Sequence, residues 1–323
     1  MDDLAYAQLR AAELGPRFCL TFVKGTDERA ALLRMGAYPD TFAERTGPDL
    51  DGAAAALSLG RWSVVIELNS AEGADHTLLE AVSRGTEALS VLRDDTALRF
   101  TYAVAGTTTV AFDPAYPSPE LTWGADPELL RHLMRPLGLH EPAAEDEETW
   151  RDAEAKAMVL AQRLTGSRLP EDPLGTPRLS ARIEPWFAGP VRTADLLPSG
   201  RRFADLLAAA EQAGAERTRE VAVAQVRSLA TTLAVDETPG LDAALAQAAR
   251  GAGQPVARDS ALGREVRRWL NEPAGELRAL AMALRGVLGR DAQVALRAAL
   301  LPVRDRLGED DGFRADIEKA LQN

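Results

Sequence analysis

Three polar residues, Glu67, Asn69 and Glu72, have the best placement for chemistry in this sequence. They end or follow the run RWSVVIELN at 61–69, whose β-branched and apolar residues predict a buried strand. Glu67 and Asn69 are two positions apart, so they project on one side of that strand, at the edge of a sheet where binding sites often form. The alternative is that these groups bond the loop backbone or face water.

A second candidate group lies in the C-terminal third of the chain, where Arg264, Arg267 and Arg268 adjoin Trp269. A basic patch with an aromatic residue can contact an acidic partner or nucleic acid. The same pattern also fits a solvated helix face whose arginines pair with nearby glutamates. Both groups are therefore named as candidate ligand or partner contacts, and no catalytic residue is assigned.

Metal, nucleotide and nucleophile motifs are missing from the sequence. The three histidines show no ligand spacing, and there is no HExxH, CxxC, GxGxxG, GxxxxGK[ST] or GxSxG. The single cysteine, Cys19, lies in an apolar run, which indicates a buried structural thiol. The adjacent carboxylates Asp94 and Asp95 are explained by a turn. We therefore expect no metal and no cofactor.

Charge and hydropathy limit the classes of partner. The 323 residues carry a formal net charge of -12, which disfavours binding to a phosphate backbone. No apolar run approaches the ~18 residues of a membrane span. The N-terminal residues are acidic and amphipathic, unlike a signal peptide. We expect a cytoplasmic protein that does not insert into a membrane, and self-association is left open.

The N-terminal part alternates helical and strand patterns. An α+β domain with a mixed or antiparallel sheet of about five strands is predicted, with the segment 86–112 as an antiparallel meander. The alanine-rich residues 53–59 predict a short helix. The expected helices are 3–14, 27–35, 76–84, 126–137 and 149–164, and the expected strands are 17–24, 61–69, 86–92, 98–103 and 104–112.

Composition divides the rest of the chain. Residues 1–166 are assigned to the α+β domain with its trailing helix, and six prolines mark 167–199 as a connector that is either a tether or a packed wrap. Residues 200–323 are predicted to form an all-α helical domain. The acidic run Glu145–Glu148 is typical of a solvated linker, although it could recruit a basic partner. The expected C-terminal helices are 200–214, 215–235, 240–250, 259–271, 274–289, 290–307 and 311–322.

Several segments of the first half are shared with a known family. They are FCLTFVKG at 18–25, RWSVVIELNSAEG at 61–73, GTEALSVLRD at 85–94, RFTYAVAG at 99–106, GADPELLRHLM at 124–134 and RLTG at 163–166. With these segments the chain resembles an actinobacterial domain family of unknown function. The resemblance covers roughly the first half and implies a fold, without an activity to carry over.

Three functional hypotheses follow. The first is a non-enzymatic protein-interaction protein, such as an adaptor, an immunity-type inhibitor or an assembly subunit, because no catalytic signature accompanies the acidic chain and its helical part. The second is a small-molecule-sensing module whose site is the loop after the strand at 61–69. The third is an enzyme of a type that the motifs do not reveal.

Overall fold

The computed structural model describes residues 2–50, 52–68, 70–95, 97–140, 152–187, 191, 195–271 and 275–322. The chain divides into two compact units, Met1–Pro190 and Val191–Asn323. An α+β unit followed by a helical unit is the fold class that the sequence predicts, and the structure confirms it.

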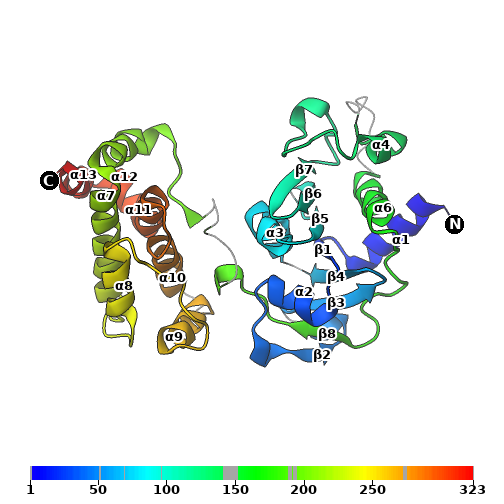
Figure 1. The fold of residues 1–323 in the computed structure, drawn as a ribbon, viewed down its shortest axis with the longest axis horizontal. Helices are drawn as coiled ribbons and strands as arrows, with labels where there is room; N and C mark the ends of the chain where they lie inside the picture. The colour runs from blue at the N-terminus through cyan, green and yellow to red at the C-terminus, as the bar shows by residue number, and fades with distance from the viewer. Residues whose placement is uncertain are drawn as a thin grey trace. The chain divides into compact units, whose positions relative to one another are not determined.

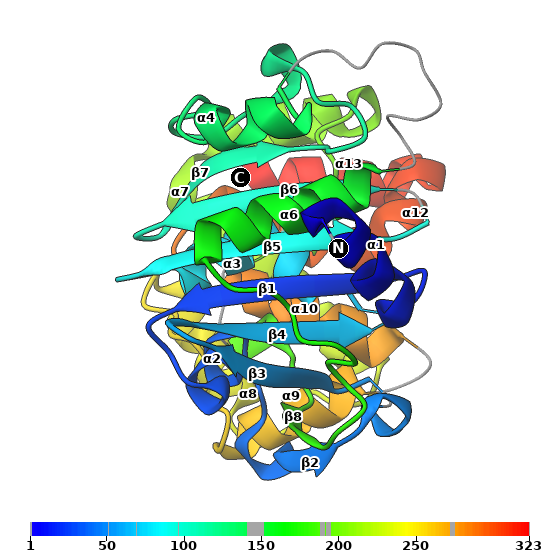
Figure 2. The ribbon, with the colours of Figure 1, turned by 90° about the vertical axis from the view of Figure 1, so that its right-hand side faces the viewer.

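The described residues of the first unit form an eight-stranded sheet in which neighbouring strands are antiparallel (Figures 1 and 2). Its order is β2-β8-β3-β4-β1-β5-β6-β7. The predicted strand at 61–69 is the central β4. The strands are β1 (Phe18–Lys24), β2 (Ala43–Arg45), β3 (Ala54–Leu59), β4 (Trp62–Leu68), β5 (Glu87–Arg93), β6 (Leu98–Val104), β7 (Thr107–Phe112) and β8 (Arg178–Ala181).

Helices cover both faces of this sheet. Helices α1 (Asp3–Leu14) and α6 (Ala153–Thr165) lie on one face (Figure 2), and α2 (Glu28–Arg34) and α3 (His76–Val82) lie on the other (Figure 1). Because side chains alternate along a strand, each face has its own core. Phe18, Leu20 and Phe22 of β1 join the core under α1 and α6, whereas Val23 joins the core under α2 and α3. A short helix, α4 (Arg131–Met134), follows β7.

Two expectations for this unit are wrong. The sheet has more than the expected five strands, and residues 53–59, expected as a helix, contain strand β3. Alanine favours a helix, but Ala55 and Ala56 pair with β4 on one side and β8 on the other. Both side chains are buried, that of Ala55 in the core under α1 and α6 and that of Ala56 in the core under α2 and α3. Tertiary pairing therefore overrides the local propensity.

The first part of the Pro-rich segment is packed into the first unit. Strand β8 inserts between β2 and β3, and Leu169 and Leu174 are buried in the core under α1 and α6. The N–H of Gly47 donates to the carbonyl of Leu174 at 2.9 Å. Between residues 167 and 187 the segment is therefore a fixed part of the fold.

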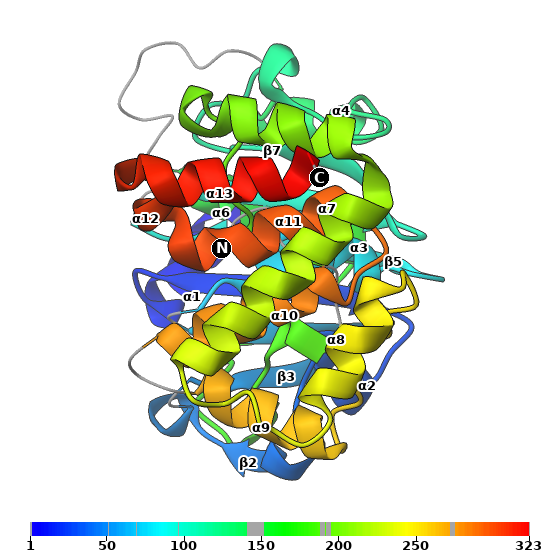
Figure 3. The same cartoon turned by 90° about the vertical axis from the view of Figure 1, so that its left-hand side faces the viewer.

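The second unit is helical (Figure 3). Gly214 has φ 79° and interrupts α7 at the boundary that the sequence predicts between 214 and 215. The helix expected at 290–307 is divided by a 3-10 turn at Leu301–Val303, which contains Pro302. No described helix is long and apolar enough to cross a membrane. The helices are α7 (Ala204–Thr232), α8 (Leu241–Ala249), α9 (Ala261–Leu270), α10 (Glu276–Val287), α11 (Ala292–Leu300), α12 (Arg304–Glu309) and α13 (Asp311–Gln322).

Candidate functional site

The carboxyl group of Glu67 holds the turn that follows β4. Its Oε1 accepts hydrogen bonds from the Ser70 hydroxyl at 2.9 Å and the Glu72 N–H at 2.8 Å, and its Oε2 accepts from the Gly73 N–H at 2.9 Å. Glu67 is fully buried, so it does not project a polar group for binding at the sheet's edge, and the alternative that it bonds the loop backbone holds. The buried carboxyl thus bonds the loop backbone. Asn69 lies outside the described residues.

The environment of Glu67 is close-packed and buried. A Cβ added to Gly73 would lie 1.8 Å from Thr21 Oγ1 and 2.9 Å from Glu67 Oε2, so only glycine fits there. Burial raises the pKa of Glu67 from its ordinary 4.5 to about 7, although the hydrogen bonds from Gly73, Ser70 and Glu72 act in the opposite direction. On β1, Cys19 pairs with Glu67, and burial raises the pKa of its thiol.

A cavity of about 280 Å³ lies beside this turn. Its walls come from the start of β1, the turn after β4 and the turn after β5, which meet at one end of the sheet. Arg17 and Asp95 form an ion pair in its lining, and Arg93 pairs with Glu154 of α6 at 2.9 Å. The lining residues are Arg17, Ser70, Ala71, Leu92, Arg93, Asp94 and Asp95.

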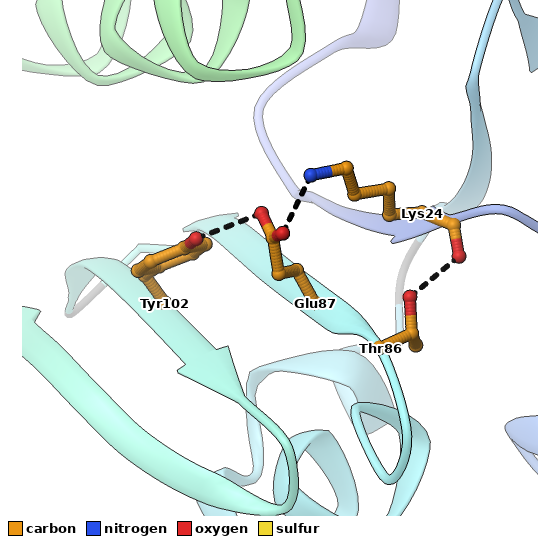
Figure 4. Close-up of polar contacts among 4 residues, drawn as sticks. All are labelled: Lys24, Thr86, Glu87 and Tyr102. Carbon is orange, nitrogen blue, oxygen red and sulfur yellow. Dashed lines mark hydrogen bonds and ion pairs between the residues drawn. The ribbon is translucent and has the colours of Figure 1, made fainter.

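The opposite end of β1 carries a polar network that the sequence analysis missed (Figure 4). Glu87 accepts from Lys24 Nζ at 2.5 Å and from the Tyr102 hydroxyl at 2.9 Å, while the Thr86 hydroxyl donates to the Lys24 carbonyl at 2.7 Å. Burial raises the pKa of Glu87, but the hydrogen bonds from Lys24 and Tyr102 outweigh burial and lower it overall. Burial and Glu87 raise the pKa of Tyr102. The network ties β1, β5 and β6 together.

A third feature is the segment that follows β7, residues 113–130, which we name the edge segment. Trp123 and Ala111 of β7 exchange two backbone hydrogen bonds of 2.9 and 2.7 Å. Gly124 has φ +131°, and a Cβ there would lie 2.3 Å from the carbonyl oxygen of Thr109. Only glycine allows this approach, so the edge segment is held closely against the outer strand of the sheet.

The edge segment concentrates exposed apolar side chains. Among the described residues six large apolar side chains are exposed, and four of them belong to this segment. Single exposed apolar residues are ordinary, whereas contiguous exposed apolar patches are typical of interaction surfaces. The charged residues of 113–130 are all acidic. The four exposed side chains are Tyr116 at 50%, Leu121 at 59%, Trp123 at 47% and Leu129 at 42%.

The candidate basic and aromatic patch of the C-terminal unit needs one correction, and one of its arginines forms the glutamate pair of the alternative, a solvated helix face. Trp269 of α9 is fully buried, so it is a core residue and presents no aromatic surface. The helical spacing that brings it beside the arginines turns it toward the unit's interior. Arg268 pairs with Glu265 at 2.5 Å, and Arg264 donates to the carbonyl of Asp259 at 2.7 Å. Arg267, two positions before Trp269, is only partly exposed.

Two further sequence expectations concern metals and the acidic run. Within the described ranges no group of three or more His, Cys, Asp or Glu side chains is placed to hold a metal ion. The run Glu145–Glu148 lies outside those ranges.

Residues 1–180, more than half of the chain, match a family of unknown function, DUF6461. The chain belongs to this family. The DUF6461 match covers all strands from β1 to β7, the Glu67 turn and the edge segment, and it ends within β8. No curated protein and no solved structure is significantly similar to the chain.

Proposed function

We propose that the DUF6461 part of this chain is a non-enzymatic protein-interaction module, an adaptor or assembly subunit, that binds a protein partner through the edge segment 113–130. The observation that carries the proposal is the concentration of Tyr116, Leu121, Trp123 and Leu129, all exposed, on one segment. Tryptophan and tyrosine are the residues that most often dominate the binding energy of protein interfaces.

The backbone of the edge segment supports this proposal. Because Trp123 is bonded to Ala111 in both directions and Gly124 lies directly against Thr109, the segment is ordered before any partner arrives. A preorganised surface loses less conformational entropy on binding than a flexible one. The indole of Trp123 also meets the ring of His76 edge-on, with centroids 5.7 Å apart, which fixes the orientation of the tryptophan.

The charge of the edge segment indicates the chemistry of the partner. Asp113, Glu120, Asp126 and Glu128 belong to the same segment as the apolar side chains, and 113–130 contains no lysine or arginine. Complementary potentials steer association and exclude partners of the same sign. The proposed partner therefore presents a basic surface with an apolar centre, in the cytoplasm of the actinobacterial host that the sequence resemblance suggests.

The test is affinity purification of the tagged chain from its native host, comparing the wild type with Leu121→Asp. Leu9→Asp is the matched control, because Leu9 of α1 is 48% exposed and lies outside the edge segment. We expect a stoichiometric partner with the wild type and Leu9→Asp, and its loss with Leu121→Asp. A partner that Leu121→Asp retains, or no partner at all, would contradict the proposal.

A further inference from the structure

We propose that the cavity lined by Arg17, Ser70, Ala71 and Asp94–Asp95 binds a small zwitterion, a molecule such as a free amino acid that carries one ammonium and one carboxylate group. This proposal is independent of the partner-binding function. The cavity measures about 280 Å³, close to the lower end of the ~300–1,000 Å³ range of small-molecule sites. A ligand of amino-acid size fits that volume.

The charges of the lining select the class of ligand. Arg17 pairs with Asp95, and their side chains are 54% and 56% exposed. An exposed ion pair contributes little to stability, so a ligand can break the contact between Arg17 and Asp95 with only a small loss of free energy. A ligand with a single charge would leave either Arg17 or Asp95 without its counterion. A zwitterion gives its carboxylate to Arg17 and its ammonium to Asp95, so both charges stay paired.

Two further wall groups fit such a ligand. Asp94 Oδ1 accepts the Ala97 N–H at 2.8 Å, which fixes a second carboxylate beside Asp95 and favours an ammonium group at this side of the cavity. Leu92 is 5% exposed and adds apolar surface to the lining. The ligand's side chain is therefore expected to be small and uncharged.

The cavity wall formed by Ser70 and Ala71 is fixed by the buried carboxyl of Glu67. Ser70 and Ala71 belong to the turn that the buried Glu67 carboxyl fixes through its bonds to Ser70, Glu72 and Gly73. The wall is therefore formed before binding, and its shape does not depend on the ligand. This is the turn where the sequence analysis placed a ligand-sensing site.

The test measures binding of single L-amino acids at millimolar concentration to the full chain, by thermal shift and then by calorimetry. Bound ligand raises the melting temperature by mass action. We expect at least one amino acid with a small uncharged side chain to bind. Its analogues that lack the carboxylate or the ammonium group should bind at least about tenfold more weakly.

Substitutions distinguish binding in this cavity from a general effect of changing a surface charge. Arg17→Gln and Asp95→Asn should each weaken binding about tenfold or more, because each leaves one ligand charge unpaired. Arg168→Gln is the control, since Arg168 and Asp3 form a pair of similar exposure, 50% and 40%, outside the cavity. The proposal is overturned if no amino acid binds, if a singly charged analogue binds equally well, or if binding survives both cavity variants.

Discussion

The stability of the first unit depends on the protonation of the buried Glu67 carboxyl. This group is fully buried and has a pKa of about 7, against 4.5 for an exposed glutamate. Because the pKa is raised in the folded state, the stabilisation is complete below pH 4.5 and is lost as the pH rises through 7. A shift of this size corresponds to a loss on the order of 3 kcal/mol in the free energy of unfolding.

The measurement is urea unfolding of the wild type and Glu67→Gln at several pH values between 4.5 and 8. The wild type should lose stability relative to Glu67→Gln as the pH rises, because the amide cannot ionise. Glu44→Gln, at an exposed position on β2, is the control and should follow the wild type. Parallel curves for the wild type and Glu67→Gln would show that Glu67 does not titrate in this range.

Gly73 gives a second prediction at this scale. Gly73→Ala should destabilise the first unit by about 2–3 kcal/mol or more, because the new methyl group would overlap Thr21 Oγ1. Gly25→Ala is the control, since Gly25 has open space around it, and its positive φ of 68° alone should cost about 1 kcal/mol. Adding Thr21→Ala to Gly73→Ala should recover part of the loss in a double-mutant cycle. Equal costs for the two glycine variants would refute the steric argument.

At the scale of elements, β5 and β6 carry two buried hydroxyl groups opposite each other. Ser90 and Thr101 are register partners, are almost fully buried, and have hydroxyl groups without a hydrogen-bond partner among the described residues. Ser90→Ala and Thr101→Val should therefore raise the free energy of unfolding by about 1 kcal/mol each. Thr86→Val is the contrasting control and should destabilise, because the Thr86 hydroxyl donates to the Lys24 carbonyl. If Ser90→Ala and Thr101→Val both destabilise the protein, the two hydroxyl groups make hydrogen bonds.

Elements with a clear pattern could be predicted from the sequence. Strand β4 combines β-branched residues with polar ends, and the break of α7 at Gly214 coincides with a glycine that helices avoid. Strand β3 could not be predicted, since its alanines favour a helix and only the pairing with β4 and β8 makes them a strand. Strand β8 is four residues long in a Pro-rich segment, so its local signal is weak.

The candidate sites could be predicted only in part, because burial, exposure and cavities depend on tertiary contacts. The position of Glu67 and the turn after it could be read from the end of β4, but burial and the adjoining cavity depend on contacts with β1 and β5. The edge segment gave no signal beyond its prolines, because exposure of Leu121 or Trp123 is a tertiary property. For Trp269 the error is the opposite one. The sequence suggested an exposed aromatic residue beside arginines, but its side chain is buried in the core.

At the scale of the whole molecule, the first unit needs its Pro-rich segment. A fragment of residues 1–190 retains β8, Leu169 and Leu174, whereas a fragment of residues 1–166 loses all three and leaves β2 without its partner strand. We expect fragment 1–190 to unfold cooperatively in urea, and fragment 1–166 to be much less stable or unfolded. Equal stability of the two fragments would show that β8 is dispensable.

Partner binding by the edge segment is tested by placing a photoreactive amino acid at position 121 and, in a second variant of the chain, at position 9 of α1. Both positions hold exposed leucines in the wild type, so the substitutions are matched in burial. We expect irradiation in the native host to give one discrete adduct with a basic protein at position 121 and none at position 9. The same adducts at both positions, or none at position 121, would contradict partner binding by the edge segment.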